Sequence, residues 1–255
     1  IQLVNRLITN VTSIPANKIK TGDLDEMDWD IYDHKIKSLQ DAPIFIDDSP
    51  GLSIFELRSK ARRLVKEHNV QIIIIDYLQL MNASGMRFQS REQEISLISR
   101  SLKVLARELN IPIIALSQLN RKVEERSNEG KRPQLSDLRE SGAIEQDADM
   151  VCLIHRPEYY KIFQGPNGED LRGIAEIIIA KHRNGETGDV SLRFKGEFTR
   201  FSNLSEQSFG NGGGGILLES KSNNKPTSAP TITLPEENYS TLKKKKMRPI
   251  FVVLH

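Results

Sequence analysis

An aspartate stands directly after a run of four isoleucines, at the end of Gln71-Ile-Ile-Ile-Ile-Asp76. A continuous β-branched run is typical of a strand buried on both faces of a sheet, and we expect such a strand over residues 71–80. An acid where a parallel strand ends can orient the Mg²⁺ ion that bridges nucleotide phosphates, as a Walker B aspartate does. The alternative is an acid that caps a neighbouring loop, and Asp76 alone does not separate the two.

A glutamine follows the next apolar run, Pro112-Ile-Ile-Ala-Leu-Ser117. The Gln118 amide can donate to a γ-phosphate or orient a water molecule, which would let it report whether ATP or ADP is bound. An ordinary polar residue at the start of a loop is the alternative.

Two cations close a later apolar strand, in Ile179-Ala-Lys-His-Arg183. The period of two in a strand points the side chains of Lys181 and Arg183 the same way, and that of His182 the other way. Such a pair can neutralise the charge on a transferred phosphoryl group, especially across a subunit boundary, as an arginine finger does. A solvated basic strand end is the alternative.

A polar segment, Leu135-Ser-Asp-Leu-Arg-Glu-Ser-Gly-Ala-Ile-Glu-Gln-Asp-Ala-Asp149, has Gly142 in its middle. We expect a loop whose backbone amides and Arg139 approach phosphates closely. A solvated turn is the alternative.

Strand and helix patterns alternate around these residues. Ser53-Ile-Phe-Glu56 has capping-box spacing before an amphipathic stretch, and residues 91–109 repeat their leucines and isoleucines at helical spacing. This rhythm predicts an α/β fold with a mostly parallel sheet that ends in hairpins or edge strands. Strands are expected at 71–80, 112–117, 150–154, 174–180 and 190–194.

Charge is nearly balanced, with 36 basic and 34 acidic residues. Bulk charge therefore predicts no nucleic-acid partner, and any such affinity must come from a local patch. The single cysteine, Cys152, excludes an intrachain disulfide, and its apolar neighbours predict a packing role. No apolar stretch reaches the ~20 residues that a membrane span needs, so we expect a cytoplasmic protein.

The composition changes after Leu204. Glycines, then Ser, Thr, Asn and Pro residues, precede Lys243–Lys246, and we expect residues 205–255 to form a flexible tail. The lysine run could contact nucleic acid, although a solvated charge run is the commoner case. The apolar end Ile250–Leu254 has no predicted place to pack.

Four segments occur here in an order that resembles the C-terminal domain of bacterial DnaB-type replicative helicases. They are Ile-Asp-Tyr-Leu-Gln-Leu-Met, Ala-Leu-Ser-Gln-Leu-Asn-Arg, Asp-Leu-Arg-Glu-Ser-Gly-Ala-Ile-Glu-Gln-Asp-Ala-Asp and Ala-Lys-His-Arg-Asn-Gly-Glu-Thr-Gly. The resemblance covers residues 1–204. It implies a RecA-like, doubly wound motor domain in a homohexameric ring around single-stranded DNA, with ATP and Mg²⁺ between neighbouring subunits.

The resemblance also implies roles for single residues. Asp76 is the expected Walker B acid and Gln118 the γ-phosphate sensor, while Lys181 and Arg183, with His182 beside them, reach the ATP of the next subunit. Arg6 is expected to contact nucleotide, and residues 82–94 to form a loop facing the channel. The residues expected to hold the DNA backbone are Arg139, Glu140 and Gly142.

The family's Gly-x-x-x-x-Gly-Lys-Ser/Thr loop, the Walker A loop, does not occur in these 255 residues. Because that loop is the main cradle for the β- and γ-phosphates, we expect the chain alone to be inactive. The helical pattern already present at Ile1 predicts a fragment, with the loop and catalytic glutamate upstream. Primase and a helicase loader are partners expected for the full-length parent. A phage-type primase-helicase motor and a non-catalytic DNA-binding or assembly fragment remain alternatives.

Overall fold

The computed structural model describes residues 2–120, 123–126, 131–204 and 250–253. It begins with three helices, α1 (Gln2–Thr12), α2 (Ala16–Thr21) and α3 (Glu26–Gln40). The side chain of Asp25 caps α3 by accepting from the Asp28 amide, and Lys18 of α2 pairs with both carboxylates. These contacts fix the turn between α2 and α3.

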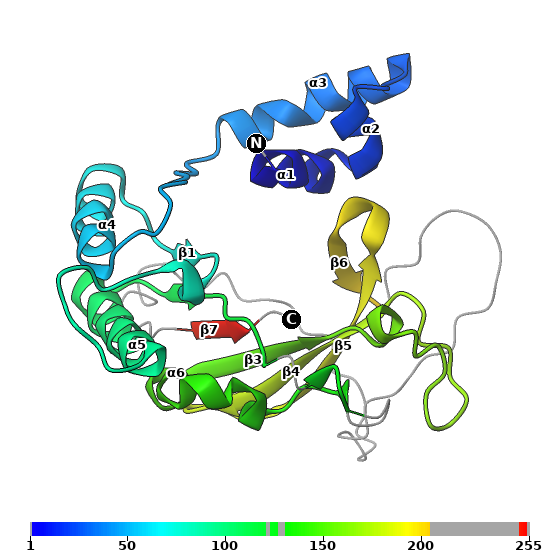
Figure 1. Ribbon diagram of the computed structural model, residues 1–255. Coiled ribbons are helices and arrows are strands. Elements are labelled where there is room, and N and C mark those ends of the chain that lie inside the picture. The colour runs from blue at the N-terminus through cyan, green and yellow to red at the C-terminus, as the bar shows by residue number, and fades with distance from the viewer. Residues whose placement is uncertain (1, 121–122, 127–130, 205–249, 254–255) are drawn as a thin grey trace, which may run out of the picture. The chain divides into compact units, whose positions relative to one another are not determined.

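The rest of the described chain is built on one seven-stranded sheet in the order β1-β2-β7-β3-β4-β5-β6 (Figure 1). Its strands are β1 (Ile73–Ile75), β2 (Ile113–Ala115), β3 (Met150–His155), β4 (Ile174–His182), β5 (Gly188–Lys195), β6 (Arg200–Asn203) and β7 (Ile250–Val253).

The sheet has a parallel half and an antiparallel half. The pairs β1–β2, β2–β7 and β7–β3 are parallel. The pairs β3–β4, β4–β5 and β5–β6 are antiparallel. The predicted ending in hairpins is confirmed, and with it the RecA-like α/β fold. The β4–β5 and β5–β6 pairs are antiparallel because the links after β4 and β5 are too short for a crossover helix.

Two amphipathic helices supply much of the core. Helix α4 (Ile54–His68) and helix α5 (Arg91–Leu109) start at the capping serines Ser53 and Ser90 and end at left-handed asparagines. Both predicted helices are confirmed. Glu108 of α5 pairs with two arginines of α4, and the core beneath contains Leu57, Ile98, Leu102, Leu105, Ile113, Ile144, Val151 and Leu153.

The first strand differs from the prediction. Only three of residues 71–80 are paired in β1, and Leu78–Leu80 form the short 3-10 helix η1. β1 is an edge strand with β2 as its single neighbour, and Ile72 and Ile74 are 46% and 64% exposed. The prediction of a strand buried on both faces is therefore wrong, because nothing in the described chain covers the second face of β1.

The end of the chain also differs from the prediction. Residues 250–253 form β7, which lies between β2 and β3 and is parallel to both. These four residues are consequently part of the sheet and not of a flexible tail. The rest of the predicted tail, residues 205–249 and 254–255, lies outside the described residues.

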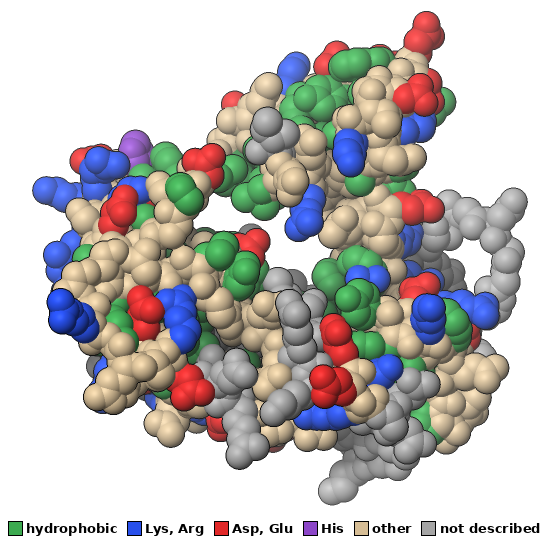
Figure 2. Space-filling model, in the orientation of Figure 1, with side chains coloured by type: hydrophobic (Ala, Val, Ile, Leu, Met, Phe, Trp, Pro, Cys, Tyr) green, Lys and Arg blue, Asp and Glu red, His purple; other side chains and the backbone are tan. Residues whose placement is uncertain are grey.

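Two sequence expectations about composition can be compared with the structure. Cys152 is buried in β3, as its predicted packing role requires, and this burial raises the pKa of its thiol. No helix among the described residues is long and apolar enough to cross a membrane. On the face drawn in Figure 2, acidic and basic side chains are interspersed over α4 and α5 and form no patch of one sign.

Candidate nucleotide and DNA site

Asp76 and Gln118 follow neighbouring parallel strands at the same edge of the sheet. Ile75 pairs with Ala115, and the Leu116 amide donates to the Ile75 carbonyl at 2.8 Å. Asp76 is exposed just beyond this rung, and Gln118 lies two residues past Leu116. The predicted acid and sensor are therefore brought to one edge, as the rule for ligands in parallel sheets requires.

Sequence reasoning missed Gln79, which joins these two strand ends. Its Nε2 donates to Ser117 Oγ at 2.9 Å, and its Oε1 accepts from the Gln118 amide at 3.4 Å. Ser117 is buried, so its hydroxyl needs such a partner. Gln79 stands three residues after Asp76, in η1. The spacing of apolar and polar residues around it does not distinguish it from a glutamine exposed to solvent.

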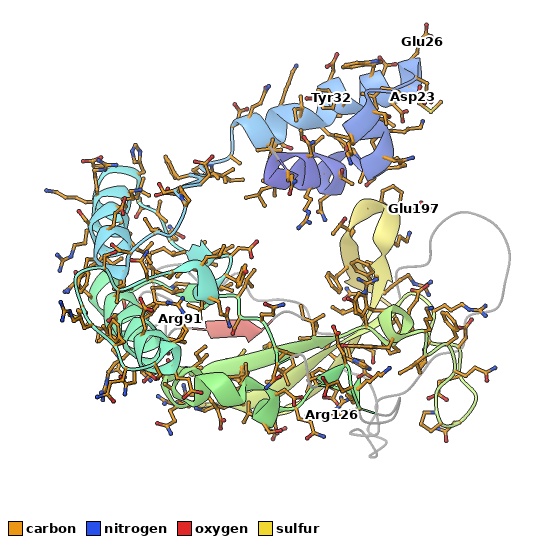
Figure 3. The ribbon with its side chains drawn as sticks, viewed as in Figure 1. Asp23, Glu26, Tyr32, Arg91, Arg126 and Glu197 are labelled. Carbon is orange, nitrogen blue, oxygen red and sulfur yellow. The ribbon has the colours of Figure 1, made fainter. Side chains whose placement is uncertain are left out.

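Arg91, at the start of α5, holds the backbone that follows Asp76. The guanidinium of Arg91, which is labelled in Figure 3, donates to the carbonyls of Gln79, at 2.9 Å, and Met81, at 2.7 Å, and pairs with Glu94. The Ala83 amide donates to Glu94 at 2.8 Å, and this bond lowers the pKa of the Glu94 carboxyl. Residues 91–94 of the predicted channel-facing loop 82–94 belong to α5, so the prediction is wrong at that end, and the remaining residues are tied to α5 through Ala83.

A cavity of about 170 Å³ opens between η1, the start of α5 and the polar segment 135–149. Its lining residues come from η1, from the start of α5, from the chain after β2 and from η4 (Leu135–Ser141). They include Gln79, Arg91, Gln118, Asn120 and Asp137. The sensor glutamine therefore borders the segment that carries the predicted DNA contacts.

That segment is helical and not a loop. Residues 135–141 form the 3-10 helix η4, and α6 (Gly142–Asp147) continues directly from it. Gly142 has a helical φ of −51°, so its backbone does not require glycine. A Cβ added there would meet nothing within 4 Å, which leaves room for a close approach from outside. Arg139 and Glu140 lie on η4, and their side chains are outside the described part of the structure.

Asp137 anchors η4. Its buried carboxylate accepts from the Gln134 amide at 2.7 Å and pairs with Arg126, which is labelled in Figure 3. The Asn120 amide donates to the Asp137 carbonyl at 3.2 Å, which joins η4 to the chain that follows Gln118. Leu138 and Ile144 are buried beneath the segment. These contacts explain why a sequence rich in polar residues is helical here.

Lys181 and Arg183 lie elsewhere on the sheet. Because β4 is antiparallel to β3, its end lies beside the start of β3, where Lys181 pairs with Val151 and His182 with Met150. β2, β7 and β3 separate β4 from β1. Four strand spacings put about 19 Å between β1 and β4, well beyond the reach of one side chain.

The side chains of both cations turn to the end of α6. Lys181 Nζ donates to the Glu145 carbonyl, and Arg183 Nη2 to that of Gln146. The predicted common direction of the two side chains is therefore confirmed. Burial, with the positive charge of Arg183 beside it, lowers the pKa of Lys181.

His182 lies between the two cations in sequence, but no described hydrogen bond or ion pair brings His182 or Arg6 to Asp76 and Gln118. His182 Nδ1 lies 3.4 Å from the Glu186 carbonyl, within the turn that follows β4. Arg6 is exposed on α1, and no described hydrogen bond or ion pair joins it to Asp76 or Gln118. Their expected nucleotide contacts stay predictions.

The family model for the DnaB-like helicase C-terminal domain matches residues 1–203. The chain belongs to this family. It is 48% identical over 203 residues to the replicative DNA helicase DnaC of Bacillus subtilis and, over the same length, to the replicative DNA helicase DnaB of Geobacillus stearothermophilus. In both comparisons the match covers 80% of this chain and 43% of the relative, so the chain spans less than half of these helicases.

Two solved structures have the same fold. One is a DnaB-like replicative helicase, solved in a study of its interactions with primase, which is 43% identical, with a TM-score of 0.69, over 79% of this chain and 48% of its own. The other is an ATPase domain with the same identity and TM-score over 78% of this chain and 69% of that one. The chain therefore has the RecA-like fold of these helicase domains.

The donor set at the end of β1 fits Mg²⁺ in the manner typical of nucleotide enzymes. Mg²⁺ keeps several waters and takes one or two carboxylates together with substrate phosphates. Asp76 offers one exposed carboxylate at this edge. Within residues 2–120, 123–126, 131–204 and 250–253 no three His, Cys, Asp or Glu side chains gather as a metal site.

Proposed function

We propose that this chain is the motor part of a replicative DNA helicase that couples ATP hydrolysis at subunit interfaces to 5′–3′ translocation on single-stranded DNA and to duplex unwinding. Membership of the DnaB-like family supports the class of activity. The direction of travel, the homohexameric ring and the location at the replication fork in the cytoplasm are carried over from the family.

One observation supports hydrolysis at subunit interfaces above all others. Asp76 and Gln118 lie at the carboxyl edge of the parallel strands, while Lys181 and Arg183 lie beside the start of β3, about 19 Å across the sheet. A nucleotide held at the first group is out of reach of the second group in the same chain. Head-to-tail contacts in a closed ring bring the second group of each subunit to the nucleotide of its neighbour.

The roles then divide as follows. Asp76 would hold Mg²⁺, which would supply positive charge to the phosphates when bound, and Gln118 would contact the γ-phosphate. Lys181 and Arg183 stabilise the charge of the transferred group from the next subunit, with His182 and Arg6 as further nucleotide contacts. Arg139, Glu140 and Gly142 hold the DNA backbone, next to the cavity that Gln118 borders.

The 255 residues contain no Walker A loop, so we propose that the chain alone does not turn over ATP. A magnesium-dependent turnover by the chain, lost in Asp76→Ala, would contradict this. Primase and a loader are proposed partners of the full-length protein, and the solved relative studied with primase supports the first of them.

Subunit mixing tests the interface site in a full-length helicase that contains residues 1–203 and a Walker A loop. Asp76→Ala removes the half that acts within the subunit, and Arg183→Ala removes the half that acts on the neighbour. Each variant alone should lose ATP turnover by at least about a hundredfold. In rings mixed at equal ratio, on the order of a quarter of the interfaces combine two intact halves, so turnover should recover to roughly that fraction.

Mixtures that stay inactive although native mass spectrometry detects mixed rings would contradict the interface site. The matched control is Arg172→Ala, an exposed arginine on the loop before β4, which should leave turnover unchanged.

The absent Walker A loop also supports a second candidate, a non-catalytic DNA-binding or assembly fragment. Size-exclusion chromatography of the chain with and without single-stranded DNA and nucleotide separates the two. A complex with DNA but none with nucleotide favours the fragment. A primase-type zinc domain encoded in the same gene would instead favour a phage-type primase-helicase.

A further inference from the structure

Asp149 lies between two cations at the start of β3. Its side chain is 7% exposed, and its Oδ1 accepts from Arg183 Nη1 at 3.0 Å. The Asp149 carbonyl accepts from the Arg183 amide at 2.9 Å, so one residue binds both the backbone and the guanidinium of Arg183. Lys103 Nζ, on α5, lies 3.7 Å from the same Oδ1.

These contacts fix the guanidinium and leave most of its donors free. Of its five N–H groups, one donates to Asp149 and one to the Gln146 carbonyl, and the described residues accept no others. The Arg183 side chain is 35% exposed, whereas its carboxylate partner is buried. The free donors can therefore reach an anion from outside while the others keep the plane of the group fixed.

The second cation prevents Asp149 from cancelling the charge of Arg183. Lys103 is 12% exposed, and its Nζ donates to the Asp147 carbonyl at 2.6 Å, so it stays beside the carboxylate. The single charge of Asp149 therefore cannot neutralise both Lys103 and Arg183. Asp149 Oδ2 is buried without a hydrogen-bond partner among the described residues, which is a poor arrangement for stability alone.

We propose that Asp149 is a positioning residue for Arg183, which orients the guanidinium toward the nucleotide of the neighbouring subunit. The inference rests on the proposed interface site. Asp149 itself is not expected to contact nucleotide, because it is buried behind Arg183.

The test is Asp149→Asn in the full-length helicase, which keeps the shape of the side chain and removes its charge. A misplaced arginine should lower ATP turnover by about 10- to 100-fold. A positioning role makes a further demand that a merely structural role does not. Mixing with Asp76→Ala subunits should restore turnover, because the acid-deficient subunit supplies an intact Arg183, whereas mixing with Arg183→Ala subunits should restore none.

Asp147→Asn is the matched control, since it makes the same change two residues earlier, and no described hydrogen bond or ion pair of the Asp147 side chain would be lost. It should keep normal turnover. If Asp149→Asn proves too unstable to assemble, Asp149→Glu keeps the charge and should give reduced turnover with the same pattern of complementation.

Normal ATP turnover in Asp149→Asn would overturn the inference. It would also be overturned if Asp149→Asn regained no turnover in either mixture while Arg183→Ala and Asp76→Ala subunits complemented each other. If Arg183→Ala and Asp76→Ala subunits did not complement each other, the proposed interface site would be overturned instead. The two failures are therefore distinguishable in one set of mixtures.

Discussion

Gln79 Nε2 donates to Ser117 Oγ at 2.9 Å, across 38 residues of sequence. The bond joins η1, which follows Asp76, to the chain two residues after β2, one residue before Gln118. The amide at 118 also donates to the Gln79 side chain, at 3.4 Å. A displacement of Asp76 should consequently also shift Gln118 through Gln79.

Gln79→Leu should weaken this connection with little change in volume. Losing the hydrogen bond to the buried Ser117 hydroxyl should lower the free energy of unfolding of the chain by about 1–2 kcal/mol, as a shift of the urea midpoint measures. In the full-length helicase, the stimulation of ATP turnover by single-stranded DNA should fall by about tenfold, because Gln118 is no longer held in place.

Gln71→Leu is the matched control, since Gln71 is exposed ahead of β1, at the opposite end of the same strand. It should change neither quantity. A stimulation ratio that survives Gln79→Leu would show that the ends of β1 and β2 are not coupled through this side chain.

Arg139→Ala in the full-length protein tests the proposed phosphate contact. Each lost contact with a single strand should reduce the slope of log K against log salt by about 0.7. Affinities for a labelled oligo-dT at four salt concentrations give the slope. Arg172→Ala removes an exposed arginine far from η4 in sequence and should leave it unchanged. The same slope in wild-type protein and Arg139→Ala would count against a phosphate role.

Leu102→Ala tests the packing of α5 against the sheet. Leu102 is fully buried, and its truncation should cost about 2–5 kcal/mol in the free energy of unfolding. Val104, on the same helix, is 53% exposed, and Val104→Ala should change that free energy by less than about 0.5 kcal/mol. Similar urea midpoints for the two variants would mean that the core is assigned wrongly.

Asp47→Asn tests the ion pair that fixes the segment before α4. Hydrogen bonds from Lys60 and Ser49 lower the pKa of Asp47 to about 2, from the ordinary value of 3.8. A depressed pKa stabilises the fold above the ordinary value, and the stabilisation is lost as the pH falls toward the folded value. The wild-type chain should therefore be the more stable of the two at pH 7, and the difference should shrink between pH 4 and pH 2.

Urea midpoints measured at several pH values provide the check. Because this carboxylate is partly exposed, the difference should also decrease in high salt. A difference that is independent of pH would assign the effect of Asp47→Asn to something other than its charge.

The sequence determined the elements whose signals are local. Ser53 and Ser90 mark the starts of α4 and α5, and the period of two in a strand predicts that Lys181 and Arg183 point the same way. Capping and side-chain periodicity depend on residues a few positions apart, so a single sequence contains them in full. The four segments around Asp76, Gln118, Arg139 and Lys181 likewise sufficed to predict the family.

Only the tertiary structure decided which strands are neighbours. It made β1 an edge strand, placed Ile250–Val253 between β2 and β3, and put Arg183 beside the start of β3 instead of beside Asp76. It also formed the contacts of Gln79 with Ser117 and of Asp149 with Arg183, across 38 and 34 residues. Such pairings depend on the register and direction of strands far apart in the chain, for which no local pattern of residues contains the information.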